Sequence, residues 1–380
     1  MAKMVNSWNE WDPLKRIILG SAWGTHQPKS DISGNYDAPT KPGWDGRMPE
    51  EMEAKAIELM NGFQKILESR GVVVDRPQPF DTTQKTVTPD WECEVQRGFQ
   101  PCRDVFFCTG NEIMEATMSI RARWFEYVAF RDILENYFHN DPEFSWVSAP
   151  KPRLTEQSFE HNWWFNYKNV WSDEVKRERM MKRQWHTTNK EPLFDAADGI
   201  RFGKDIFWNV SAISNAAGID WLRRHFSSRG LRLHEIQFDG DYHHWHIDVC
   251  IMPLRPGLCV YNPYYMYLTP QFEELLKKND WEMVPAVPPT HQYNMRIGTL
   301  NERVGPYWIS MNTLSIDPKT MCIEAHETGY QEQINKMGIE VIPVDYAEQV
   351  AFGGSLHCST VDVYREGGCE DYFPNQVEGY

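Results

Sequence analysis

The chain has 380 residues, with 39 Lys and Arg against 54 Asp and Glu, which gives a formal net charge of −15. A chain of this length buries a sizeable core without disulfides, and 41% hydrophobic with 24% charged residues is ordinary for a globular protein. The negative charge argues against a protein that binds nucleic acid, because such proteins gather positive charge to displace counterions. A small cationic substrate suits this balance better.

The chain has no apolar run of about 18 residues, the length that spans a membrane. Its first twenty residues also lack the apolar stretch of a secretory signal, so we expect a cytoplasmic protein without a membrane contact. The cysteines lack the close, regular spacing of a disulfide framework, so we expect reduced thiols. There are eight of them, at 93, 102, 108, 250, 259, 322, 358 and 369.

One pattern recurs five times along the chain: an amphipathic helix, a break at Gly or Asn-Asp, and a short apolar strand. In the first copy the apolar stripe consists of Ala56, Leu59, Met60, Phe63 and Leu67. Its strand follows at 72–74, and the later strands are expected at 144–147, 231–236, 281–284 and 339–343. Two short strands precede each of the last four helices, at 104–108 with 112–116, 199–202 with 205–208, 247–252 with 258–261, and 308–316 with 320–323.

Residues 15–20 would complete the first unit by pairing with 358–364. Five ββαβ units cannot each bury both faces alone, so the pattern predicts an α/β protein whose units close into a five-bladed propeller with pseudo-fivefold symmetry. An open α/β sheet is the alternative. We expect one domain over residues 1–380. An insertion at 155–193, with tryptophans at 163, 164, 171 and 185, would form a pocket wall or lid, or would pack on the body.

Cys358 follows the pair Gly353-Gly354. Glycines before a thiol permit an unusual backbone path and the close approach of a ligand. A buried cysteine is more often an inert apolar side chain, so the glycine pair by itself does not identify a nucleophile.

The densest polar cluster is His243-His244-Trp245-His246-Ile247-Asp248. On a strand, His244, His246 and Asp248 would share one face, as the ligands of a divalent metal do. The alternative is one catalytic histidine with a neighbouring carboxylate that moves protons for a thiol. We favour the second interpretation, because the chain has no CxxC or HExxH motif and the other histidines are dispersed.

Two further carboxylates stand at the start of predicted strands, Asp195 in the run 194–199 and Asp104 in the run 101–104. Such residues most often cap a turn. If the units form a ring, both would converge with Cys358 and the histidine cluster.

Several segments, taken in order, resemble the family of L-arginine:glycine amidinotransferase and its cyanobacterial relatives. They are Arg103-Asp104, Gly110 to Ala116, Arg121 to Tyr127, Phe194 to Phe207, His246-Ile247-Asp248, Ser310-Met311-Asn312 and Gly353 to Cys358. The likeness covers nearly the whole chain, and that family has the five-unit α/β propeller of the pentein type.

The resemblance implies Cys358 as the nucleophile, His246 as general acid and then base, and Asp195 as its supporting carboxylate. It implies that Asp104 and Asp248 hold a guanidinium, a planar cation that carboxylates bind well. The implied reaction moves the amidino group of L-arginine to a primary amine through an amidino-cysteine. It requires no metal and no cofactor, and a homodimer is the family's usual state.

The chain departs from the glycine-using members at two places. Asn262-Pro263-Tyr264-Tyr265-Met266 and Gly305-Pro306-Tyr307-Trp308 replace segments whose Arg and Ser anchor a substrate carboxylate in the family. With Trp245 in place of the usual Met, and with His243 and Tyr265, the pocket would suit a larger amine without a carboxylate. This pattern is most similar to the members that serve saxitoxin biosynthesis, whose acceptor is an arginine-derived amino ketone. Arg303 is our candidate for holding the carboxylate of the arginine donor.

Three alternatives remain at this point. The acceptor could be glycine or another amino acid, the enzyme could be an arginine-deiminase-like hydrolase that uses water, or the chain could be a binding protein without activity.

Overall fold

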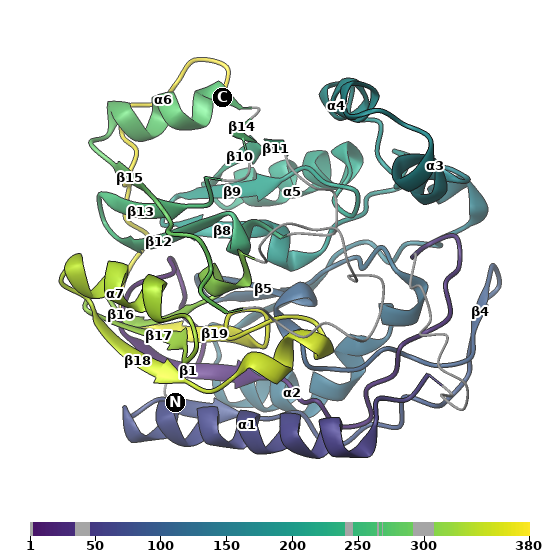
Figure 1. Ribbon diagram of the computed structural model, residues 1–380, viewed down its shortest axis with the longest axis horizontal. Helices are drawn as coiled ribbons and strands as arrows, with labels where there is room; N and C mark the ends of the chain where they lie inside the picture. Colours follow the sequence, from purple (N-terminus) through teal and green to yellow (C-terminus); the bar gives the residue numbers. More distant parts are fainter. Residues whose placement is uncertain (1–2, 35–45, 240–245, 264–265, 268, 292–307) are drawn as a thin grey trace.

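The computed structural model describes residues 3–34, 46–239, 246–263, 266–267, 269–291 and 308–380. Over these residues the chain is an α/β protein, built from five three-stranded sheets with helices on their outer sides (Figure 1). The sheets consist of β19 (Thr360–Arg365), β1 (Leu14–Leu19) and β2 (Val73–Asp75); β5 (Phe106–Thr109), β6 (Glu112–Glu115) and β7 (Ser145–Ser148); β8 (Gly199–Phe202), β9 (Asp205–Asn209) and β10 (Arg232–Ile236); β12 (Ile251–Arg255), β13 (Leu258–Tyr261) and β15 (Glu282–Pro285); and β16 (Leu314–Asp317), β17 (Thr320–Glu324) and β18 (Glu340–Val344).

All five sheets have the same connectivity. The first strand pairs antiparallel with the middle strand, and the middle strand pairs parallel with the third. A parallel pair needs a crossover, and a helix supplies it in each sheet. These helices are α1 (Glu50–Ser69), α2 (Arg131–Asn140), α5 (Ala216–Ser228), α6 (Pro270–Lys278) and α7 (Thr328–Lys336). The predicted fivefold recurrence is therefore confirmed.

The predicted apolar stripe of α1 is buried over its whole length. In α2, Ile133, Leu134 and Tyr137 are buried, whereas Phe138 is 58% exposed.

The first sheet joins segments from far apart in the sequence. β1 pairs with β19 with Leu19 opposite Thr360 and Ile17 opposite Asp362, as the sequence predicted for 15–20 and 358–364. This pairing completes the first sheet with the last strand of the described chain.

The predicted strands at 104–108, 247–252 and 308–316 begin later than expected. Their first residues form short 3₁₀ helices: η1 (Cys102–Asp104), η6 (Ile247–Val249) and η7 (Trp308–Met311). A fourth, η5 (Ala196–Asp198), precedes β8, and a turn at 356–359 precedes β19.

These five turns contact one another in a closed series. η1 contacts η5, η5 contacts η6, and η6 contacts η7. Just after η7, the side-chain oxygen of Asn312 accepts the Cys358 backbone N–H at 3.0 Å. The Cys358 carbonyl in turn accepts the backbone N–H of Arg103 in η1 at 3.1 Å. Residues placed on these turns are therefore brought together from all five units.

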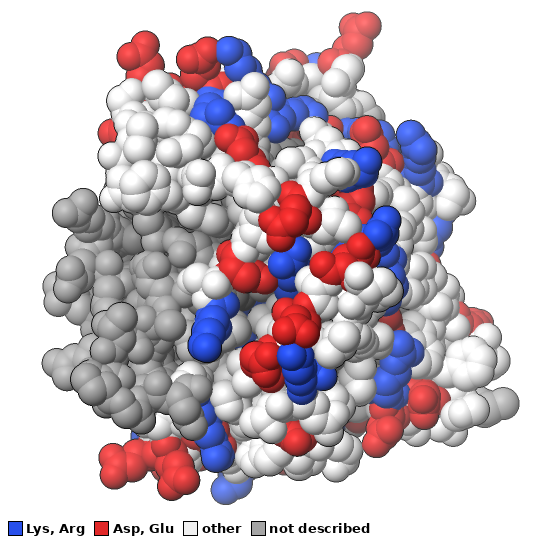
Figure 2. All heavy atoms as spheres, turned by 90° about the vertical axis from the view of Figure 1, so that its right-hand side faces the viewer, with Lys and Arg blue, Asp and Glu red and all other residues white. Residues whose placement is uncertain are grey.

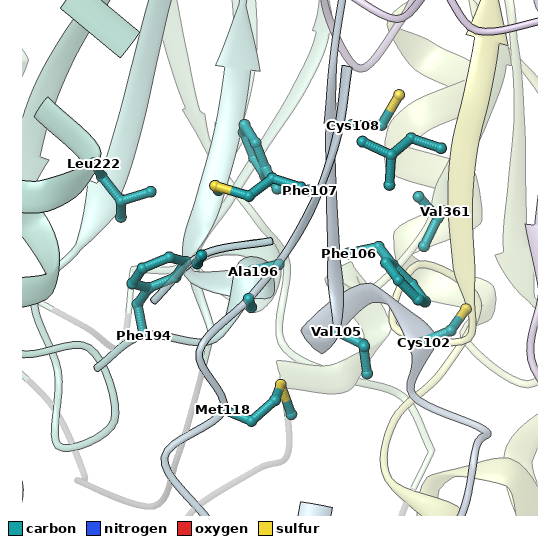
Figure 3. Close-up of a cluster of buried hydrophobic side chains, with 14 of the residues drawn as sticks. Cys102, Val105, Phe106, Phe107, Cys108, Met118, Phe194, Ala196, Leu222 and Val361 are labelled. Atoms are coloured by element: carbon teal, nitrogen blue, oxygen red, sulfur yellow. The ribbon is translucent and has the colours of Figure 1, made fainter. Parts of the chain in front are cut away.

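Apolar side chains fill the spaces between neighbouring sheets. Successive residues of a strand point to opposite faces, so β5 contributes to the packing on both of its sides. Figure 3 shows Phe106 on the side of Val361 and Phe107 on the side of Phe194, and all four are buried. This packing fixes η1, which leads directly into β5.

The tryptophan-rich insertion forms η4 (Glu156–Ser158), α3 (Trp163–Asn169) and α4 (Asp173–Met181). Trp163, Trp164 and Trp185 are buried and belong to the same core cluster as Phe106, while Trp171 is partly buried against it. The packing interpretation therefore holds for these tryptophans, and the role of the segment as a pocket wall or lid stays a prediction.

Short elements complete the described chain. They are β3 (Thr86–Val87), β4 (Glu92–Cys93), β11 (Phe238–Asp239), β14 (Met266–Tyr267), η2 (Arg121–Arg123), η3 (Glu126–Phe130) and η8 (Ala347–Phe352). Among the helices that the structure describes, none has the length and apolarity to cross a membrane. All eight cysteines are described, and none of them forms a disulfide.

On the face that carries α3, α4 and β4, Lys and Arg side chains lie next to Asp and Glu (Figure 2). Lys85, for example, pairs with both Glu92 and Glu94 at 3.0 Å. The described part of this face shows no broad basic patch of the kind that nucleic-acid binding needs.

Candidate active site

The turns at the starts of the five sheets carry the predicted site residues. Asp104 ends η1, Asp195 directly precedes η5, and His246 directly precedes η6, which contains Asp248. Cys358 lies in the turn before β19. The structure thus brings together the five residues that the sequence singled out for chemistry.

Cys358 is buried and touches two polar side chains. Its Sγ lies 3.0 Å from Asn312 Nδ2 and 3.5 Å from Asp248 Oδ2. Gly354 has φ +140°, and a Cβ added there would lie 2.4 Å from Cys358 Cβ and 2.6 Å from its Sγ. The unusual backbone path that the sequence predicted for the glycine pair is therefore present, and only a residue without a side chain fits beside this thiol. The close approach of a ligand stays a prediction.

His246 lies between two carboxylates. Its Nδ1 is 3.5 Å from Asp104 Oδ1, and its Nε2 is 3.6 Å from Asp195 Oδ2. The other oxygen of Asp104 is held by Arg123 at 2.7 Å. Arg123 also forms an ion pair with Glu126 at 2.7 Å, and Asp104, Asp195, Arg123 and Glu126 are all buried.

Electrostatics set the resting protonation state of the site. Burial acts to lower the pKa of His246, but the carboxylates of Asp104, Asp195 and Asp198 outweigh it and raise the pKa to about 10. Burial, and then the carboxylates of Asp248 and Asp104, raise the pKa of Cys358 well above its ordinary value. At neutral pH the free protein therefore holds an imidazolium at His246 and a neutral thiol at Cys358.

Several buried carboxylate oxygens lack hydrogen-bond partners among the described residues. In the site they are Asp104 Oδ1, Asp248 Oδ1 and both side-chain oxygens of Asp195. A buried carboxylate without donors is costly. A ligand that is both positively charged and rich in N–H donors would satisfy these oxygens, and a guanidinium is such a group.

The strand geometry behind the metal hypothesis is absent. Residues 247–249 form a 3₁₀ turn, so His246 and Asp248 point to different partners: His246 faces Asp104 and Asp195, whereas Asp248 faces Cys358 and Asn312. His244 lies outside the described residues.

Two other groups have ligand atoms within 4.8 Å of one another and so have spacing that could suit a metal ion. They are Asp104, Asp195 and His246 in the site, and Glu324, His326 and Asp345 away from it.

Four predicted pocket residues, His243, Trp245, Tyr265 and Arg303, lie outside the described residues. In contrast, the structure reveals residues to which the sequence assigned no role, among them Asn312, Arg123 and His357. The position of Asn312 offered a usable signal, because it stands two residues before β16, just as Cys358 stands two residues before β19 and Asp104 two before β5.

The fold is one that enzymes acting on arginine and its derivatives share. A solved dimethylarginine dimethylaminohydrolase superposes over 92% of this chain and 99% of its own with a TM-score of 0.54. The N-terminal domain of an arginine dihydrolase from cyanobacteria does so over 93% and 98% with a TM-score of 0.58. At 14% and 12% sequence identity, these two structures show the fold alone.

Other comparisons define the family. The chain is 35% identical to the mitochondrial glycine amidinotransferase of Gallus gallus, over 97% of this chain and 85% of that protein. It is 31% identical to the L-arginine:L-lysine amidinotransferase of Pseudomonas savastanoi pv. phaseolicola, over 97% and 96%. A solved amidinotransferase of the saxitoxin biosynthetic pathway from Microseira wollei matches with a TM-score of 0.83 and 33% identity over 97% and 99%. A comparison with protein-family models found no match.

The chain therefore belongs to the amidinotransferase family, and it is an enzyme. The resemblance that the sequence motifs indicated is confirmed.

Proposed function

We propose that this enzyme transfers the amidino group of L-arginine, through an amidino-Cys358 intermediate, to a primary amine without a carboxylate. The acceptor that we propose is the arginine-derived amino ketone of saxitoxin biosynthesis. One observation carries the donor half of this proposal: Asp104, Asp195 and Asp248 each have a buried oxygen without a hydrogen-bond partner among the described residues, and their carboxylates lie 3.5 to 3.6 Å from His246 or Cys358. A guanidinium placed there would supply N–H donors to these oxygens and a positive charge in addition to that of the His246 imidazolium.

The first half-reaction begins when bound arginine lowers the pKa of Cys358. The guanidinium offsets the carboxylates that disfavour a thiolate, so the thiol loses its proton to solvent. The thiolate attacks the guanidinium carbon and forms a C–S bond. The C–N bond to ornithine then breaks, His246 gives its proton to that nitrogen, and ornithine leaves.

The second half-reaction uses the neutral His246 that remains. It takes a proton from the incoming ammonium, and the amine nitrogen attacks the amidino carbon. The C–S bond then breaks as that nitrogen gives its second proton to the departing sulfur, which returns Cys358 as a thiol. The high pKa of His246, about 10, suits this step, because primary ammonium groups such as that of lysine ordinarily titrate near 10.4. Asp195, 3.6 Å from His246, would stabilise the imidazolium in both directions.

Our proposal for the amine acceptor is supported by other observations. The segments at 262–266 and 305–308 lack the Arg and Ser with which glycine-using members of the family anchor a carboxylate. A structural neighbour at TM-score 0.83 is an amidinotransferase of the saxitoxin biosynthetic pathway. Trp245, His243 and Tyr265 would line the acceptor pocket, and Arg303 would hold the arginine carboxylate.

We also propose that residues 1–380 form one domain in which the five units close into a five-bladed α/β propeller. The closed series of contacts among the five turns and the pairing of β1 with β19 support this arrangement. The cytoplasmic location and the homodimer stay predictions.

A product assay with labelled arginine tests the function. We expect ornithine, together with a mass increase on Cys358 that is absent from Cys358→Ser. Citrulline formed without any amine acceptor would overturn the transferase in favour of a hydrolase. With a panel of amines, amino ketones should be better acceptors than glycine, and a preference for glycine would overturn the acceptor proposal.

A further inference from the structure

His357 precedes the candidate nucleophile in the chain, and its side chain lies between two buried carboxylates. Its Nδ1 is 2.8 Å from Asp248 Oδ2, and its Nε2 is 3.4 Å from Glu10 Oε2. Only 4% of the His357 side chain is exposed. The imidazole contacts Asp248, and the Asp248 carboxylate in turn lies 3.5 Å from Cys358 Sγ.

One carboxylate oxygen of Asp248 accepts hydrogen bonds from two side chains, and the other has no hydrogen-bond partner among the described residues. Its Oδ2 accepts from His357 Nδ1 and from Asn312 Nδ2 at 2.9 Å, and it lies 3.5 Å from Cys358 Sγ. Its Oδ1 is buried and has no hydrogen-bond partner among the described residues. Because a carboxylate is planar and rigid, fixing Oδ2 on two donors also fixes the direction of Oδ1.

On its Nε2 side, His357 contacts Glu10, which belongs to a buried network of charged side chains. Glu10 receives two hydrogen bonds from the Arg201 guanidinium, Nε to Oε1 at 2.8 Å and Nη2 to Oε2 at 2.7 Å, and a third from the Arg201 backbone N–H at 3.3 Å. Arg201 also bonds Asp362 at 2.6 Å, and Arg103 pairs with Asp362 at 2.8 Å. All of these side chains are buried, so Glu10 is a fixed point against which the imidazole is held.

The contact with His357 also affects the protonation state of Asp248. Burial acts to raise the pKa of Asp248, but the hydrogen bond and charge of His357, together with the charges of His246 and Arg103, outweigh it, so the pKa lies below its ordinary value. The carboxylate is therefore ionised as well as oriented.

We propose that His357 is a positioning residue for donor binding: its Nδ1–H holds Asp248 Oδ2 so that Oδ1 faces the guanidinium of arginine beside Cys358. This inference rests on the function proposed above. His357 itself touches neither the substrate nor the reacting atoms.

Three substitutions separate the two contacts of the imidazole. The amide nitrogen of Asn occupies nearly the position of histidine Nδ1, and that of Gln nearly the position of Nε2. His357→Asn therefore keeps a donor to Asp248, His357→Gln keeps a donor to Glu10, and His357→Leu keeps neither.

The readout is the rate of amidino-Cys358 formation against arginine concentration, with thermal denaturation to show that each variant is folded. We expect His357→Leu to raise the half-saturating arginine concentration by roughly ten- to hundredfold, as expected for the loss of a hydrogen bond to a charged group, with a smaller change in the maximal rate. His357→Asn should recover most of this loss, and His357→Gln should not. A folded His357→Leu with unchanged half-saturation, or equal recovery by Asn and Gln, would overturn the proposal.

A double-mutant cycle with Asp248→Asn completes the test. If His357 acts through Asp248, then His357→Leu adds little once the carboxylate is gone, whereas additive effects would assign it a separate role. Absence of any adduct in the unmodified enzyme would instead refute the proposed function, so the two failures are distinguishable.

Discussion

Replacing Asp195 by Asn should weaken His246 as an acid-base group without disturbing its surroundings. Asn has the shape of Asp, and both carboxylate oxygens of Asp195 lack hydrogen-bond partners among the described residues, so the substitution breaks no hydrogen bond of the described structure. It removes one of the negative charges that raise the pKa of His246 to about 10. Without that charge the imidazolium is less stable, and the pKa falls.

The size of the effect follows from the geometry. At the 3.6 Å between His246 Nε2 and Asp195 Oδ2, two unit charges in an effective dielectric of about 20 attract by about 5 kcal/mol. Arg123 Nη1, 3.7 Å from the same carboxylate, offsets part of this attraction. Since one pKa unit corresponds to about 1.4 kcal/mol, even a third of the interaction moves the titration of His246 down by about one pH unit.

The first half-reaction needs the imidazolium, so its alkaline limb should move to lower pH in Asp195→Asn. Single-turnover formation of amidino-Cys358 across pH, with an NMR titration of His246, measures both quantities. Asp345→Asn, an exposed position outside this site, is the matched control. An unchanged titration of His246 in a folded Asp195→Asn would refute the electrostatic reasoning.

Three further predictions concern the thiol and its surroundings. Arginine, or an unreactive guanidinium analogue, should lower the pKa of Cys358, seen as thiolate absorbance appearing at a lower pH; absorbance independent of the ligand would contradict a substrate-induced thiolate. Gly354→Ala should reduce adduct formation at least a hundredfold, because its Cβ would lie 2.4 Å from Cys358 Cβ, and strain at φ +140° should destabilise the fold by about 1–3 kcal/mol. Gly230→Ala, with φ +75° but no atom within 4 Å of the added Cβ, is its control and should leave adduct formation unchanged. EDTA should not affect turnover, and a loss of activity that zinc restores would support a metal at His246, Asp104 and Asp195.

The repeated strands and helices could be predicted because their signals are local. Helical spacing of apolar residues marked α1, and β-branched and aromatic runs marked the strands, whatever lay far away in the sequence. The pairing of β1 with β19 was also predictable, since a fivefold pattern left one unit without its first strand.

The 3₁₀ turns at 102–104, 247–249 and 308–311 could not be predicted in the same way. Their residues read as the beginnings of strands, and they turn because each packs against the turn of the neighbouring unit. That error also produced the shared strand face of His246 and Asp248, which the structure replaces with two separate settings.

Asn312 and His357 were missed for a related reason. A single Asn or His has no sequence pattern that marks it as part of a site. The role of each residue follows from its contact with Asp248, which is 64 residues from Asn312 and 109 from His357 in the sequence. Comparing equivalent offsets before the strands would have found Asn312, whereas the contact of His357 with Glu10 had no signal in the sequence.

The pairing of β19 with β1 bears on how the enzyme is made. A nascent chain that has been synthesised only as far as residue 350 already contains Asp104, Asp195, His246 and Asp248, yet it has neither the nucleophile nor the strand that completes the first sheet. We therefore expect the site to be completed late, when the segment from Cys358 to Arg365 pairs with β1, which lies far earlier in the chain. Contacts this distant in sequence are slow to form. We thus expect ribosome-bound or C-terminally shortened chains to bind neither arginine nor the thiol-directed reagents that mark the finished site.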